Sequence, residues 1–160
     1  MHALTEPLSK DEAVIVMRRT MDAPRELVWK AFTTPKHVMQ WYGGYGFTNP
    51  VCEMDVRPGG HWHHVMRTPD GTEFTLDFVF LEVVEPERLV WQNVDQGKRS
   101  AGGARSCVNT VTFKDLGAQT EWQLVARFNS IAERDTASQM GFSEMVDQGS
   151  DKLAEVLKTL

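Results

Sequence analysis

The chain has 160 residues, of which 41% are hydrophobic and 24% are charged, and its formal net charge is −5. This charge disfavours nucleic acid and anionic membrane surfaces as partners, because binding phosphate groups requires concentrated positive charge. No apolar run approaches the ~20 residues of a membrane span, and residues 1–10 lack the basic start and apolar stretch of a secretion signal, so we expect a cytoplasmic protein.

The length predicts one domain with a substantial core. We place this domain at residues 12–160 and expect residues 1–11 to form a flexible leader. Cys52 and Cys107 lie in strand-like segments, and in a cytoplasmic protein we expect both to be free, buried thiols.

The first predicted elements are one strand and two short helices. Residues 13–21 are rich in Val, Ile and Met, which is typical of a strand. Asp22-Ala23-Pro24 then favours a helix start, because a proline near the first helical position removes no internal hydrogen bond. Thr34-Pro35 repeats this signal, so a second short helix is predicted toward Trp41, ending at Gly43-Gly44.

Strands alone are predicted in the middle of the chain. They are separated by Pro/Gly turns or by a short acidic link, and successive strands joined in this way form an antiparallel meander. Residues 95–105 are polar and rich in glycine, so we expect a mobile loop there. The six predicted strands cover residues 48–56, 61–67, 73–84, 89–94, 106–114 and 120–128.

The chain is predicted to close with one long helix. Ser130 and Glu133 have the spacing of a capping box at its start. From Phe142 to Leu160, apolar residues recur in steps of three and four, which makes a continuous stripe on one side of the helix. The sheet is the apolar surface on which such a stripe can pack.

Together these elements predict an α+β fold, in which a curved antiparallel sheet of seven strands grips the long C-terminal helix. The two short helices follow the first strand. Strand twist makes a large sheet curl, and one helix does not fill the whole concave side of a curled sheet. The remaining space is either packed with large side chains or left as a pocket.

Four stretches carry a resemblance to a known family: residues 21–29, Trp41-Tyr42-Gly43 with Gly46-Phe47, residues 55–60 through 69–71, and residues 82–90. Residues 141–144 and 151–153 also fit. In order and spacing, these stretches resemble the helix-grip fold of the START and pollen-allergen superfamily, also called SRPBCC, in the branch named after the activator of heat-shock protein 90 ATPase. The resemblance covers residues 14–160.

The resemblance implies a fold first. Members of this superfamily commonly hold an apolar or aromatic small molecule between the sheet and the long helix, and some relatives are cyclases or hydrolases. The chain departs from the usual pattern at Trp41-Tyr42-Gly43-Gly44, where Trp-Trp-Gly-Pro is common, at Phe78, where a small residue is usual, and at the histidines 61, 63 and 64. These departures change the size and polarity of the implied pocket.

Side-chain alternation predicts which residues face the long helix. Trp62, His64 and Met66 share one face of their strand, and three later strands present a similar face. The helices contribute three more residues. The predicted ligand-binding residues are therefore Trp41, Trp62, His64, Met66, Trp91, Asn93, Asn109, Trp122, Phe142 and Met145.

The strand at residues 73–84 gives no such prediction. Its two faces are both apolar, with Phe74, Leu76, Phe78 and Phe80 on one and Val79, Leu81 and Val83 on the other. A β-bulge that switches the inward face would account for this pattern.

Three polar residues, His64, Asn93 and Asn109, lie on the predicted inward face. Each needs a partner, because an unpaired buried polar group costs ~1–3 kcal/mol. They either bond one another, hold water molecules or orient a ligand. For His64 two interpretations stay open, a ligand anchor or a core histidine with satisfied hydrogen bonds.

No catalytic residue, metal site or cofactor is predicted. His61 and His63 share a face, but a zinc site needs three or four ligands, and the chain has neither CxxC nor HExxH spacing. Solvated surface histidines are the preferred interpretation. An acid–base pair of His64 with Glu144 or Asp77 is the enzymatic alternative, in the style of a cyclase or hydrolase.

The preferred function is binding of a small hydrophobic or aromatic molecule between the sheet and the C-terminal helix. Isolated polar groups among aromatic walls are typical of ligand pockets. The alternative is an interaction module, either a chaperone-associated protein or a homodimer, which would have a closed, dry core and an exposed apolar patch.

Overall fold

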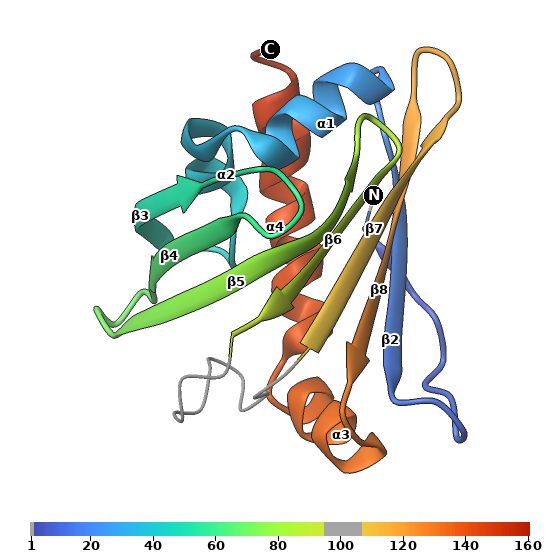
Figure 1. The fold of residues 1–160 in the computed structure, drawn as a ribbon, viewed down its shortest axis with the longest axis vertical. Coiled ribbons are helices and arrows are strands. Elements are labelled where there is room, and N and C mark those ends of the chain that lie inside the picture. Colours follow the sequence, from blue (N-terminus) through green and yellow to red (C-terminus); the bar gives the residue numbers. More distant parts are fainter. Residues whose placement is uncertain (1, 95–106) are drawn as a thin grey trace.

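Figure 1 shows the computed structural model, which describes residues 2–94 and 107–160. The loop predicted at residues 95–105 lies outside these described residues. Within them, eight strands form one antiparallel sheet: β1 (Leu4–Thr5), β2 (Val14–Met21), β3 (Thr48–Met54), β4 (His61–Arg67), β5 (Glu73–Val84), β6 (Arg88–Asn93), β7 (Cys107–Asp115) and β8 (Thr120–Phe128). Across the sheet the strands run in the order β1-β2-β8-β7-β6-β5-β4-β3.

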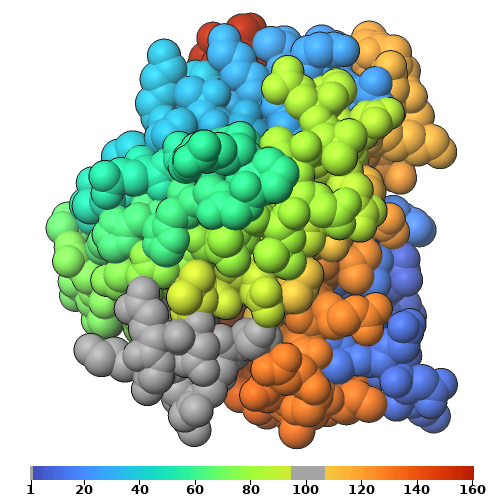
Figure 2. Space-filling view, viewed as in Figure 1, coloured from blue at the N-terminus to red at the C-terminus, as the bar shows by residue number. Residues whose placement is uncertain are grey.

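The described residues also form four helices: α1 (Arg25–Thr33), α2 (Pro35–Trp41), α3 (Ile131–Gln139) and α4 (Phe142–Leu157). α1 and α2 lie at one end of the molecule and α3 at the other, and α4 runs between the two ends along one face of the sheet (Figure 1). In the same view drawn space-filling, the strands lie in front of α4 and cover it almost completely, so that the C-terminal end shows only at the upper edge (Figure 2). None of the described helices combines the length and the apolar character needed to cross a membrane.

The predicted α+β fold with a curved sheet and a C-terminal helix is confirmed, with eight strands in place of seven. The additional strand is β1, in which Leu4 and Thr5 pair with Arg18 and Met17 of β2. A strand of two exposed residues is too short for side-chain alternation to reveal it. The segment expected to be a leader therefore contributes an edge strand to the sheet.

The long C-terminal helix is α4, but it does not begin at Ser130 as expected, because a separate helix, α3, precedes it. α3 begins where expected, and the Ser130 hydroxyl accepts a hydrogen bond from the backbone N–H of Glu133 at 3.1 Å. Gly141 then adopts a left-handed conformation, with φ of 93°, and ends the first helical segment. α4 starts afresh at Phe142, so its direction is independent of α3.

A β-bulge settles which face of β5 is inward. The pairing of β5 with β6 shifts register between Phe80 and Glu82. Before the shift, Leu76, Phe78 and Phe80 are buried, and after it Val83 packs against the core. The inward face therefore changes from even to odd positions along one strand, as the two competing apolar sets of the sequence suggested.

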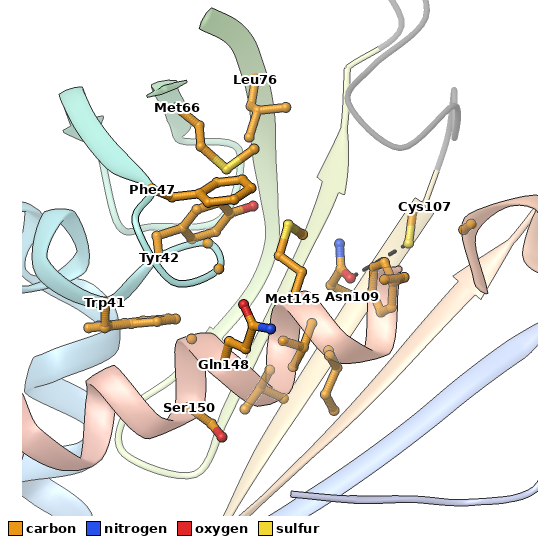
Figure 3. Close-up of a pocket in the computed structure, with 18 of the residues that line it drawn as sticks. Trp41, Tyr42, Phe47, Met66, Leu76, Cys107, Asn109, Met145, Gln148 and Ser150 are labelled. Atoms are coloured by element: carbon orange, nitrogen blue, oxygen red, sulfur yellow. Dashed lines mark hydrogen bonds between the residues drawn. The ribbon is translucent and has the colours of Figure 1, made fainter. Parts of the chain in front are cut away.

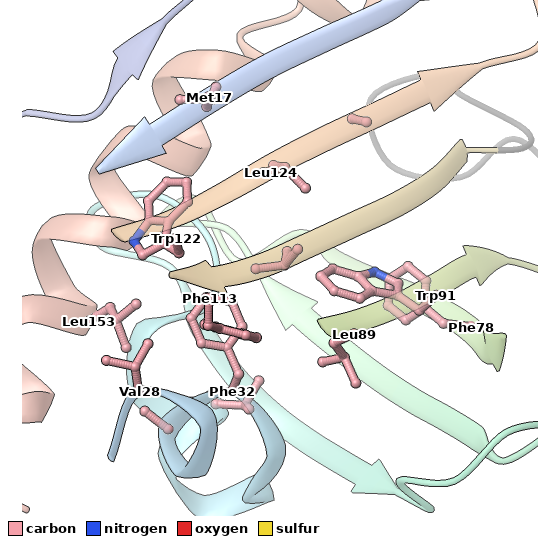
Figure 4. Packing of buried hydrophobic residues seen from close by; sticks show 14 of the residues in the cluster. Met17, Val28, Phe32, Phe78, Leu89, Trp91, Phe113, Trp122, Leu124 and Leu153 are labelled. Carbon is pink, nitrogen blue, oxygen red and sulfur yellow. The ribbon is translucent and has the colours of Figure 1, made fainter. Parts of the chain in front are cut away.

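One end of the space between the sheet and α4 is filled with side chains. Trp29 and Phe32 of α1 pack edge-on against Phe113 of β7, with ring centroids 5.7 and 5.1 Å apart. Trp122 and Leu153 lie beside this group (Figure 4). The core is solid around Phe113, and the space that remains begins beside Phe32 and Trp122 and extends toward α3.

Candidate functional site

The space that remains between the sheet and α4 is a cavity of about 470 Å³. Its floor is the inward face of β4 to β8, and α4 forms the opposite wall. The segment that joins α2 to β3 closes one side, with Tyr42 and Phe47 facing inward (Figure 3). The floor is apolar because alternate residues of each strand point away from water.

Aromatic rings make up much of the cavity wall. Trp62 of β4 packs against Phe78 of β5 and Trp91 of β6, with ring centroids 4.6 and 5.5 Å apart. On the helix side, Phe142 packs edge-on against Phe128 of β8 at 5.7 Å. The paired rings are inclined to one another by 48°, 58° and 79°, so the wall offers several ring orientations to a ligand that carries an aromatic ring.

The structure brings nine of the ten sequence-predicted residues together around this cavity. They come from two helices and four strands that are far apart in the sequence. The nine are Trp41, Trp62, Met66, Trp91, Asn93, Asn109, Trp122, Phe142 and Met145.

His64 is the exception, because it lies beneath the cavity wall and not on it. Its side chain is fully buried, with an exposed fraction of 0%. The Trp62 indole Nε1 donates a hydrogen bond to His64 Nδ1 at 3.2 Å, and His64 Nε2 lies 2.8 Å from Asn49 Oδ1. Of the two interpretations left open for His64, the structure supports the core histidine.

The hydrogen bonds around His64 also fix its protonation. Because Nδ1 accepts from the Trp62 indole, Nε2 must carry the proton that is donated to Asn49. The Asn49 amide nitrogen donates in turn to the carbonyl oxygens of Met39 and Tyr42, at 2.9 and 3.0 Å. The network therefore ties the end of α2 to β3 and β4, and it orients the Trp62 indole in the cavity wall.

The stability of the fold should consequently fall in acid. Burial lowers the pKa of His64 to about 4, from 6.5 for a free histidine. Between pH 6.5 and 4 the unfolded chain binds the proton that the folded chain excludes. The free energy of unfolding should therefore decrease as the pH falls through this window, by about 3 kcal/mol in full.

Urea unfolding at several pH values between 7 and 4 measures this effect. The His64→Gln variant supplies the reference, because glutamine does not titrate. We expect the native chain to show a steeper pH dependence than the variant. Equal slopes in the two proteins would show that His64 does not carry the effect.

The proposed acid–base partners of His64 are not near it. His63 and Asp77, which face each other across β4 and β5, lie on the opposite side of the sheet from His64. There the single oxygen Asp77 Oδ1 contacts both His63 Nδ1 at 2.7 Å and His61 Nε2 at 3.2 Å. Glu144 lies at the exposed rim of the cavity, on the first turn of α4.

One His/Asp group in the described part of the chain has its ligand atoms close together, namely His2, Asp147 and Asp151. Each of the two carboxylates already accepts a hydrogen bond from outside the group. Asp147 accepts from the backbone N–H of Ala3 at 2.7 Å, and Asp151 accepts from the Arg19 guanidinium at 2.6 Å. This group connects the N-terminal segment to α4.

The segment between α2 and β3 contributes cavity residues that the sequence did not reveal, chiefly Tyr42 and Phe47. It is held against α4 by two side chains. Gln148 Oε1 accepts from the backbone N–H of Tyr45 at 2.9 Å, and Lys152 Nζ donates to the Gly44 carbonyl at 2.9 Å. Side chains in an irregular segment do not alternate regularly between two faces, so their direction does not follow from the sequence. Only the glycines of this segment indicated that its backbone packs closely against another element.

Gly149 shows how close that approach is. A Cβ atom at this position would lie 3.1 Å from the carbonyl oxygens of Trp41 and Gly43. α4 therefore rests directly on the backbone of the α2–β3 segment. Phe74, Leu76 and Phe78 of β5 also line the cavity, and predicting them required knowing where the β5 bulge lies.

The comparison with protein families gives a match over most of the chain. The family model described as Activator of Hsp90 ATPase homolog 1-like protein matches residues 22–158. No curated protein matches the chain.

Several solved structures share the fold. A protein from Nitrosomonas europaea is 26% identical, with a TM-score of 0.84, and the match covers 95% of this chain and 97% of that protein. A protein from Arthrobacter aurescens is 19% identical, with a TM-score of 0.86, over 98% of this chain and 92% of the other. A protein from Rhodobacter sphaeroides is 19% identical, also with a TM-score of 0.86, over 100% of both chains.

Proposed function

Because the chain belongs to the Activator of Hsp90 ATPase homolog 1-like family and has an apolar cavity between its sheet and α4, we propose that it binds a small apolar or aromatic molecule there. The observation that carries this proposal is the cavity itself, with a volume of about 470 Å³. Ligand pockets typically measure ~300–1,000 Å³. Ordinary protein cores, by contrast, contain few voids larger than a water molecule.

The chemistry of the lining supports the same proposal. An empty apolar cavity loses the dispersion contacts that its walls would otherwise make, so an apolar occupant recovers them. The three rings of Trp62, Phe78 and Trp91 offer a surface for an aromatic occupant. A few polar side chains stand among them, including Asn93 and Asn109, and these would set the orientation of the bound molecule.

Two alternatives fit the geometry less well. An interaction module would be expected to have a filled core, whereas this core is filled only at the α1 end. In the described ranges of the chain, the exposed large hydrophobic residues come from separate elements. They include Leu4, Met39, Leu81 and Met140. An acid–base mechanism would require His64 to reach the cavity, and both of its ring nitrogens are engaged elsewhere.

A fluorescence titration tests the proposal. Four tryptophans line the cavity, so a neutral aromatic probe such as N-phenylnaphthylamine should quench tryptophan emission and become more fluorescent itself. We expect a saturable curve with one probe bound per chain. A linear, non-saturating response for every neutral aromatic probe would contradict the proposal.

A further inference from the structure

Among the asparagine and glutamine side chains that line the cavity, that of Asn109 is the most deeply buried. It lies on β7 with an exposed fraction of 8%. Cys107, two residues earlier on the same face of β7, donates a hydrogen bond from its Sγ to Asn109 Oδ1 at 3.6 Å. Both residues are visible in Figure 3, where the amide nitrogen of Asn109 points away from the thiol.

The hydrogen bond to the thiol shows which way the amide is turned. Burial raises the pKa of Cys107 to about 12, so the sulfur keeps its proton and acts as a donor near neutral pH. In this hydrogen bond the amide oxygen of Asn109, and not the amide nitrogen, lies on the side of the thiol. The two N–H bonds of Asn109 are therefore directed elsewhere, and none of the described residues accepts a hydrogen bond from them.

The walls around Asn109 carry almost no charge. Among the described residues that line the cavity there is no lysine, arginine or histidine, and Glu144 at the rim is the single charged side chain. An anionic ligand would lose its hydration on entering without meeting a positive partner, which is strongly unfavourable. The described walls thus favour an uncharged occupant.

We propose that the bound molecule is uncharged and carries a hydrogen-bond acceptor, such as a carbonyl, an ether oxygen or a ring nitrogen, which accepts a hydrogen bond from the Asn109 amide N–H. This inference rests on the proposed function. Trp91 lies directly opposite Asn109 in the β6–β7 pairing. The acceptor is therefore close to an aromatic wall, so an aryl ketone, an aryl ether or a nitrogen heterocycle fits best. Cys107 is a positioning residue, because it acts through the Asn109 amide.

Three related probes separate the parts of this proposal. Prodan is a neutral naphthalene with a ketone, dimethylaminonaphthalene lacks the ketone, and dimethylaminonaphthoate carries a carboxylate in its place. We expect the native chain to bind prodan about tenfold more tightly than dimethylaminonaphthalene, because one buried hydrogen bond is added. The carboxylate should bind more weakly than either neutral probe.

Variants at three positions, two on β7 and one on β6, test the role of Asn109. Asn109→Leu should weaken prodan binding about tenfold, shift its bound emission to the blue, and leave dimethylaminonaphthalene within about twofold. Cys107→Ala should cause a smaller change in the same direction. Asn93→Leu is the matched control, because it removes an amide from the same cavity, and its effect on prodan should be less than that of Asn109→Leu.

The outcomes distinguish this proposal from the one on which it rests. If none of the three probes binds the native chain, the proposed function fails. If the neutral probes bind but Asn109→Leu weakens both equally, Asn109 only shapes the wall and the acceptor proposal is overturned. Binding of the carboxylate as tight as that of prodan, or a larger prodan loss in Asn93→Leu, would overturn it as well.

Discussion

The double variant Val111→Phe/Leu124→Trp is expected to lose at least about 100-fold in affinity for neutral aromatic probes while keeping its fold. Val111 and Leu124 face each other across β7 and β8, and both line the cavity. Two added rings at this pair would occupy the middle of the space. Overpacking a dense core costs ~1–3 kcal/mol, but here the new rings extend into a void, so we expect little loss of stability.

The neighbouring pair on the same strands provides a control. Thr110 and Val125 also face each other across β7 and β8, and alternation directs them to the outer face of the sheet. Thr110→Phe/Val125→Trp adds rings of the same size without entering the cavity, so probe affinity should stay within about twofold. Probe titration and urea unfolding of both variants make the comparison, and equal affinity losses would show that the probes bind outside the cavity.

His64→Leu is expected to lower the free energy of unfolding by about 3–5 kcal/mol. The substitution leaves the buried indole N–H of Trp62 without an acceptor and Asn49 Oδ1 without a donor. Each such unpaired group costs ~1–3 kcal/mol, and the loss of the fitted ring adds to this. Because the Trp62 indole forms part of the cavity wall, probe affinity should fall as well.

Two further variants separate hydrogen bonding from packing at this position. His64→Gln can both accept from Trp62 and donate to Asn49, so it should recover part of the loss. His63→Leu changes the adjacent residue, which lies on the outer face against Asp77, and it should cost less than about 1 kcal/mol. The interpretation of His64 fails if urea unfolding finds His63→Leu as damaging as His64→Leu.

Side-chain alternation explains why much of the site was predictable. A strand with one buried face carries its pattern in the sequence, so Trp62, Met66, Trp91, Asn109 and Trp122 could be placed on the inward face without coordinates. The Pro/Gly turns between the strands set the meander. The end of the cavity near α3 was harder to predict from the sequence, because the left-handed Gly141 interrupts the helix that was expected to be continuous.

The errors have physical causes that a one-dimensional pattern does not contain. His64 has the correct parity for the cavity, but Asn49 on the neighbouring strand engages its Nε2 and keeps it in the wall. Tyr42 and Phe47 lie in a segment without a period, and their positions depend on contacts with α4. The inward face of β5 depends on one register shift, whose place is set by the pairing with β6.

The indole N–H signals of the chain in solution test most directly whether the cavity receives an apolar molecule. Of the five tryptophans, Trp41, Trp62, Trp91 and Trp122 line the cavity, while Trp29 packs against Phe113 outside it. Titration with prodan, followed by nuclear magnetic resonance, should shift the four lining indoles with one common saturation curve and leave Trp29 nearly unchanged. Saturable binding that leaves the four signals in place, or that shifts Trp29 as much as the others, would contradict a ligand site between the sheet and α4.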